Sequence, residues 1–140
     1  MAGCGGGGAA RLSKPQYEQR IQRDGQGVRK VFTRLARPPS SLQILAAEIR
    51  TGQEKLRLAA ADLAALKPPQ PIARDNAVLV AGLRRLADQL EPLRLGAARG
   101  DVKLVQRALR TLEGSSSLKA ALRATADMRR HGYEIGALGQ

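Results

Sequence analysis

LQILAAEIRTGQEKLRLAAADLAAL, residues 42–66, decides the fold class of this chain. Apolar or small residues recur in it at spacings of three and four without a break, which indicates a helix that buries one stripe. Ser40 or Ser41 is placed to cap this helix, and Pro68 and Pro69 follow where it must end. The stripe comprises Leu42, Leu45, Ile49, Gly52, Leu56, Ala59, Leu63 and Leu66.

The segment before it has the same character. Ser13 followed by Lys14-Pro15 predicts a capped helix that runs to about Ala36 and ends before Pro38. Gly25 and Gly27 weaken this helix and mark either a bend or a close approach of another helix. Its apolar stripe, which Asp24 interrupts, is Tyr17, Ile21, Val28, Val31 and Leu35.

A third helix is expected from Ile72 or Ala73, with a bend or an end near Pro92. Asn76 is the one polar member of its stripe. A polar residue there either fixes the helix register or lies at the solvated end of the bundle, and we favour the end. The stripe is Ile72, Asn76, Leu79, Leu83, Leu86, Leu90 and Leu93.

A fourth helix is expected after Asp101, which can cap it, and its pattern breaks at Gly114–Ser117. The serines there read as a turn with a fresh helix cap. The helix should end at His131, with Gly132 as the left-handed cap residue and the following tail folding back onto the bundle end. The expected inward residues are Val102, Val105, Leu109 and Leu112, then Leu118, Leu122 and Thr125.

These four segments predict an all-α fold: an antiparallel up-down-up-down four-helix bundle whose fourth helix is interrupted near Gly114–Ser117. The composition agrees, since the 140 residues include 20 leucines and 23 alanines but only three aromatic residues. We divide the chain into a flexible glycine-rich tether (1–12), the helical bundle (13–131) and a C-terminal tail (132–140).

The sequence offers no catalytic constellation. His131 is the only histidine and Cys4 the only cysteine, so neither a zinc site nor an internal disulfide has enough ligands or partners. We expect His131 to act at a helix end, where an imidazolium meets the helix dipole favourably. The prediction is a protein that is not an enzyme, with no metal and no cofactor.

Positive charge is concentrated near the start of the chain. The net charge is +12, and residues 1–37 contribute half of it. Basic residues there repeat at the helical spacing beside the apolar stripe, and they predict either a solvated face or a surface that binds anionic head groups. These residues are Arg20, Arg23, Lys30, Arg34 and Arg37.

Cys4 lies in the string Ala2-Gly3-Cys4 and is followed by four glycines. Small residues before a cysteine and a flexible stretch after it are typical of a bacterial lipoprotein processing site, where the thiol receives the lipid. The alternative is a glycine-rich N-terminus without this role. An export signal does not fit within Met1–Gly3, so lipidation at Cys4 requires a signal upstream.

The chain resembles small uncharacterised lipoproteins of high-GC bacteria. The residues that carry the resemblance are the Ala-Gly-Cys start, Leu66-Lys67-Pro68-Pro69, Leu79-Val80-Ala81-Gly82-Leu83 and Gly132-Tyr133-Glu134-Ile135-Gly136. The resemblance implies a membrane-tethered bundle in the cell envelope and supplies no catalytic residues.

Two functions follow as expectations. The first is a lipid-anchored binding or scaffold module on the outer face of the cytoplasmic membrane, with anionic lipid and an envelope protein as partners. The second is a cytoplasmic basic protein that binds nucleic acid or a protein. The second is less favoured for nucleic acid, since the three aromatic residues make no stacking platform.

Overall fold

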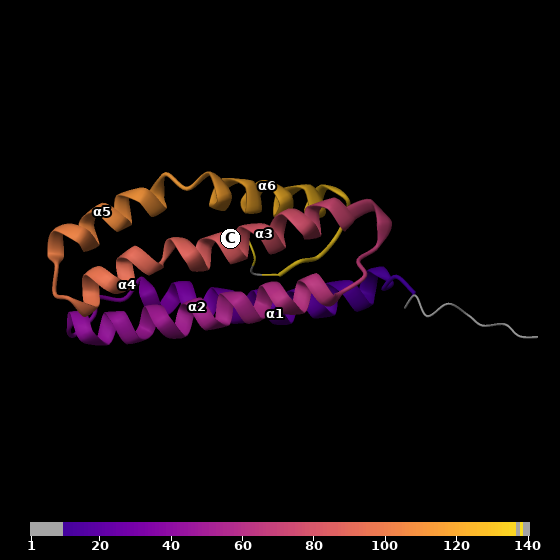
Figure 1. Cartoon of the computed structure of the whole chain (residues 1–140). Coiled ribbons are helices and arrows are strands. Elements are labelled where there is room, and N and C mark those ends of the chain that lie inside the picture. The colour runs from indigo at the N-terminus through magenta and orange to yellow at the C-terminus, as the bar shows by residue number, and fades with distance from the viewer. Residues whose placement is uncertain (1–9, 137, 139–140) are drawn as a thin grey trace, which may run out of the picture.

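The computed structural model describes residues 10–136 and 138, and every regular element in this part of the chain is a helix (Figure 1). Successive rods run in opposite directions, which confirms the predicted all-α up-down-up-down bundle. Two of the four rods are composite, because α4 follows α3 and α6 follows α5. The elements are α1 (Lys14–Leu35), α2 (Leu42–Ala65), the 3₁₀ helix η1 (Gln70–Ile72), α3 (Ala73–Gln89), α4 (Glu91–Ala98), α5 (Val102–Glu113) and α6 (Ser116–Arg130).

The rods do not close into a complete ring. Helix α2 packs against α1, α3 and α4, while α5 packs against α4 and α6 against α3. Helices α1 and α6 form no comparable interface along their lengths. The bundle is therefore open along the side between its first and last helices.

Side-chain caps begin the helices where the sequence predicts them. The Ser13 hydroxyl accepts from the backbone N–H of Gln16, and the Gln16 side chain accepts from the backbone N–H of Ser13, which makes a capping box. Ser41, Asp101 and Ser115 cap α2, α5 and α6 through N–H groups three residues on. The interruption at Gly114–Ser117 is thus the predicted turn with a fresh cap.

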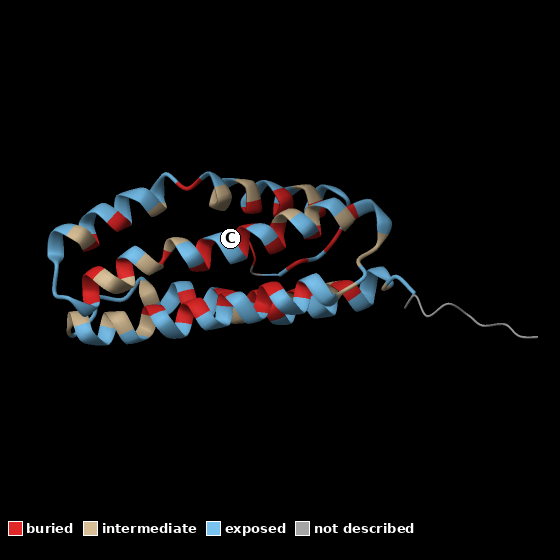
Figure 2. Cartoon of the chain, in the orientation of Figure 1, coloured by how far each residue is buried: buried red, intermediate tan, exposed pale blue. Residues whose placement is uncertain are grey.

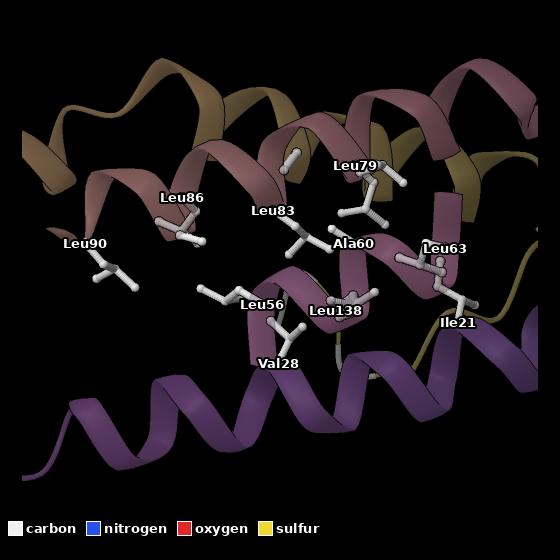
Figure 3. Packing of buried hydrophobic residues seen from close by; sticks show 14 of the residues in the cluster. Ile21, Val28, Leu56, Ala60, Leu63, Leu79, Leu83, Leu86, Leu90 and Leu138 are labelled. Atoms are coloured by element: carbon white, nitrogen blue, oxygen red, sulfur yellow. The ribbon is translucent and has the colours of Figure 1, made fainter. Parts of the chain in front are cut away.

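Most of the core comes from the first three rods, as their stripes predict, and residues of the fourth rod and the tail complete it (Figure 2). Each predicted inward residue of α1 and of the α3–α4 rod is buried or half-buried, and so is the whole stripe of α2. Figure 3 shows leucines of α2 and α3 meeting Ile21 and Val28 of α1. The largest fully buried side chains are Tyr17, Ile21, Ile49, Leu56, Leu63, Ile72, Leu79, Met128 and Ile135.

The predicted stripe of the fourth rod is partly wrong. Val102, Leu109 and Leu122 are exposed. The rod instead packs through small residues, since a Cβ added at Gly82 of α3 would lie 2.9 Å from the Cβ of Ala121. Close approach of two backbones turns alanines inward and leaves larger side chains at the edges. The buried residues of this rod include Val105, Ala108, Ala121, Ala124, Thr125 and Met128.

Asn76 does not lie at a solvated end, and that expectation is wrong. It is 5% exposed and sits between two helices. The Tyr17 hydroxyl donates to its Oδ1 at 2.8 Å, and its Nδ2 donates to the Leu63 carbonyl at 3.1 Å. The oxygen and the nitrogen of the Asn76 side-chain amide therefore both form hydrogen bonds inside the core, as a buried polar group requires. Burial, with the nearby carboxylate of Asp75, raises the pKa of Tyr17.

The bend predicted at Pro92 divides α3 from α4, and a polar network supports it. Gln53 of α2 donates through Nε2 to the Ala87 carbonyl at 3.0 Å and to Glu91 Oε2 at 2.9 Å. Arg94 donates to both carboxylate oxygens of Glu91. Hydrogen bonds from Arg94, then from Gln53, lower the pKa of Glu91 to about 2. The two hydrogen bonds from Gln53 therefore hold the bend against α2.

The tail turns back along the bundle as far as Gly25 of α1, farther than the bundle end where the sequence placed it. Gly132 takes a left-handed conformation (φ 82°) that ends α6. Beyond it Tyr133, Ile135 and Leu138 are buried, and Figure 3 shows Leu138 beside core residues of α1 and α2. The Gln22 side chain of α1 donates to the Glu134 carbonyl at 2.7 Å. The tail thus covers part of the opening between α1 and α6.

Candidate functional site

The proposed lipid attachment point, Cys4, lies outside the described residues, as does most of the predicted tether. Two of the three described tether residues contact the bundle: Arg11 donates to the Pro68 carbonyl at 2.9 Å, and the Leu12 N–H donates to the Lys67 carbonyl at 2.8 Å. Within the described part of the chain, none of the helices combines the length and apolarity that crossing a bilayer demands.

The described residues contain no cluster of three or more potential metal ligands drawn from His, Cys, Asp and Glu. His131 is exposed at the end of α6, with its Nδ1 2.8 Å from the Asp127 carbonyl oxygen. It therefore occupies the helix-end position that the sequence predicts.

Three of the five predicted basic residues gather at one place. Lys30 and Arg34 of α1, with Arg37 just after its end, line a depression of about 330 Å³ between α1 and α2. Lys55 of α2 completes the far wall, and Arg29 adds a further cation. None of the described residues that line this depression is acidic, and we call it the basic depression.

The cations of the basic depression have no ionic partners in the described structure. No ion pair there joins Lys30, Arg34, Arg37 or Lys55 to a carboxylate. All four side chains are exposed. Like charges held close together without neutralisation create a local positive potential, and an anion placed among them relieves the repulsion.

A glycine determines how closely the two walls of the basic depression approach. A Cβ added at Gly52 of α2 would lie 2.9 Å from Cγ1 of Val31, nearer than such atoms normally come. The missing side chain lets α1 and α2 pack tightly under the depression. Lys55 follows Gly52 by three residues, so it emerges on the same side of α2 next to α1.

The other two predicted basic residues lie elsewhere on α1. Arg20 and Arg23 are exposed nearer its N-terminus, and Arg23 Nε is 3.9 Å from Oδ1 of Asp24. Asp24 is buried, and its Oδ2 has no hydrogen-bond partner in the described structure. Burial raises the pKa of Asp24 and the Asp62 carboxylate adds to that effect, while Arg23 and Arg20 oppose it. These two arginines therefore favour the charged form of the buried Asp24 carboxylate and do not line the basic depression.

Lys55 was missed because sequence reasoning treated the basic residues one helix at a time. A signal was present: Lys55 lies about one turn after Gly52, which belongs to the buried stripe of α2. In an antiparallel pair, the middle of α2 lies beside the C-terminal half of α1, where Lys30 and Arg34 are. Pairing the two helices in register would have added Lys55 to the set.

Comparisons with known proteins add no family to this description: no protein-family model, no curated protein and no solved structure matches the chain.

Proposed function

We propose that this protein is a non-enzymatic helical module that docks on anionic lipid surfaces through the basic depression. The observation that carries the proposal is the convergence of Lys30, Arg34, Arg37 and Lys55 from two helices without a carboxylate among them. Each basic side chain near an anionic membrane surface contributes about 1 kcal/mol of attraction. Four together give an electrostatic contact that binds reversibly.

A lipid on Cys4 would make that contact durable. One acyl chain alone gives marginal membrane binding, and a basic patch is the usual second signal that secures it. The tether leads into α1, the helix that carries most of the basic depression. We therefore propose an envelope lipoprotein whose bundle lies against the membrane and serves as a binding or scaffold module for an envelope protein.

The docking proposal is tested by co-sedimentation with vesicles of phosphatidylcholine and phosphatidylglycerol. The variant Lys30→Gln/Arg34→Gln/Lys55→Gln should bind roughly 100-fold more weakly, because three contributions of about 1 kcal/mol are lost. The matched control is Arg84→Gln/Arg107→Gln/Arg123→Gln, which removes the same charge from exposed positions on α3, α5 and α6. The control should keep most of the affinity.

Equal losses in the two variants would mean that diffuse charge, not the basic depression, holds the protein on the vesicle. A duplex DNA titration at the same salt concentration tests the alternative partner. Tight binding to DNA with none to vesicles would transfer the function to nucleic acid. Lipidation is tested separately by mass spectrometry of the mature N-terminus from the native host, where an unmodified Cys4 would exclude the anchor and leave the docking surface standing.

A further inference from the structure

The opening between α1 and α6 is filled along only part of its length. The described part of the tail covers the opening beside the N-terminal half of α1 as far as Leu138, whose carbonyl accepts a hydrogen bond from Arg129. Leu138 packs onto Gly25, where an added Cβ would lie 2.8 Å from its Cγ. Beyond Leu138 the opening continues as a groove of about 470 Å³.

This groove is apolar and has a cation at its edge. Its floor is α3 and its walls are α1 and α6, and among the described residues that line it only Arg29 is charged. Phe32 on one wall and Leu122 on the other are 40% and 45% exposed, although both are large apolar side chains. The main apolar lining residues are Val28, Phe32, Leu83, Leu86, Leu118 and Leu122.

The tail and the volume of the groove favour a single chain as its occupant. From Gly25 to Ala36 the groove follows α1 for about 16 Å. The groove holds about 470 Å³, which is within the range of small-molecule sites. The tail shows the fitting occupant, because a non-helical segment that buries Tyr133, Ile135 and Leu138 fills the same opening farther along.

Charge separates the remaining occupants. A second copy of this chain would bring another +12 to the contact, and repulsion opposes that pairing. A ligand with an apolar tail and an anionic head meets both parts of the groove, since Arg29 can pair with the head while the walls bury the tail.

We propose that the groove is a binding site for a long-chain fatty acid, with the acyl chain along α3 and the carboxylate at Arg29. The groove shares Arg29 with the basic depression, but its apolar lining residues are distinct. The fatty-acid proposal does not depend on membrane docking.

Isothermal titration calorimetry with dodecanoate below its micelle concentration tests this site. Saturable binding of one molecule per chain is expected, and Leu122→Asp should weaken it about tenfold or more because it puts a carboxylate on the apolar wall. Leu109→Asp is the matched control, since Leu109 is also 45% exposed but lies on α5 away from the groove. It should leave the affinity unchanged within about twofold.

The role of Arg29 has its own comparison. Dodecyltrimethylammonium has the same tail with a cationic head, and it should bind wild type about tenfold more weakly than dodecanoate. Arg29→Gln should reduce the difference in affinity between dodecanoate and dodecyltrimethylammonium.

Absence of saturable dodecanoate binding would overturn the proposal, and so would an equal loss in Leu109→Asp. Sedimentation velocity tests whether a second copy of the chain occupies the groove instead. A wild-type dimer that Leu122→Asp dissociates would assign the groove to a second copy instead.

Discussion

Removing the Tyr17 hydroxyl should cost a large part of the stability of this bundle. The hydroxyl donates to Oδ1 of Asn76 at 2.8 Å, and both residues are buried. Tyr17→Phe keeps the ring but leaves the amide oxygen of Asn76 without its donor in the core. A buried acceptor left unpaired costs about 1–3 kcal/mol. For a domain of this size that loss lowers the melting temperature by about 3–12 °C.

The assay is urea unfolding followed by circular dichroism, with thermal melts beside it. The transition midpoint should fall while the slope with denaturant stays constant, because the surface exposed on unfolding does not change. Tyr133→Phe is the matched control: Tyr133 packs edge-on against Tyr17 with ring centroids 6.1 Å apart, but its hydroxyl makes no hydrogen bond in the described structure. The control should change the free energy of unfolding by less than about 0.5 kcal/mol.

A double variant sharpens this test. Tyr17→Phe/Asn76→Leu removes both polar partners and replaces Asn76 with an apolar group of similar shape, which can be nearly neutral. The free energy of unfolding should fall by less in the double variant than the two single losses added together. The reasoning is refuted if Tyr17→Phe costs less than about 0.5 kcal/mol, or if Tyr133→Phe costs as much.

Two further predictions concern α1 and its contact with α2. Gly27→Ala should stabilise the protein by up to about 1 kcal/mol, since an added Cβ meets no atom within 4 Å. Gly52→Ala should destabilise it, because its Cβ would lie 2.9 Å from Val31 Cγ1. Chemical denaturation measures the free energy of unfolding of both variants, and equal changes would contradict the packing. Asp24→Asn should stabilise the protein at neutral pH. The pKa of Asp24 is raised in the folded state, so the contribution of Asp24 to wild-type stability falls as pH rises from the unfolded value of 3.8 through the folded one. Melts across that range should show wild type losing stability relative to Asp24→Asn as pH rises, and parallel pH profiles would contradict this reading.

The first three helices were predictable because their stripes are dense and unbroken. In α2 every third or fourth residue from Leu42 to Leu66 is apolar or small, and only one helix face satisfies that spacing. The caps followed from local chemistry at Ser13, Ser41 and Asp101. Such features depend on neighbours within a few residues, which the sequence displays directly.

The fourth rod was harder because leucines and alanines occur on both of its faces. Large apolar residues were expected to point inward, yet Leu109 and Leu122 are exposed while Ala108 and Ala121 are buried. Gly82 of α3 permits the close approach of α6 at Ala121, and Gly96 of α4 permits that of α5 at Leu104 and Val105. The contact at Gly82 joins residues far apart in sequence, and the periodicity of one helix does not reveal it.

The same limit applies to the polar and functional sites. Asn76 is satisfied by Tyr17, which lies two helices earlier, so its burial could not be read from its own helix. The basic depression needed Lys55 from α2 as well as Lys30 and Arg34 from α1. The apolar groove exists because α1 and α6 do not pack together, and no local pattern encodes a missing interface.

The docking of the α1–α2 face on anionic lipid is tested most directly by nuclear magnetic resonance with vesicles that carry a paramagnetic head group. The account predicts that backbone amide signals of Lys30–Arg37 and Thr51–Lys55 broaden first and most strongly, while those of α5 and α6 persist. Uniform broadening, or broadening centred on α5 and α6, would show that another surface meets the membrane and would contradict the account.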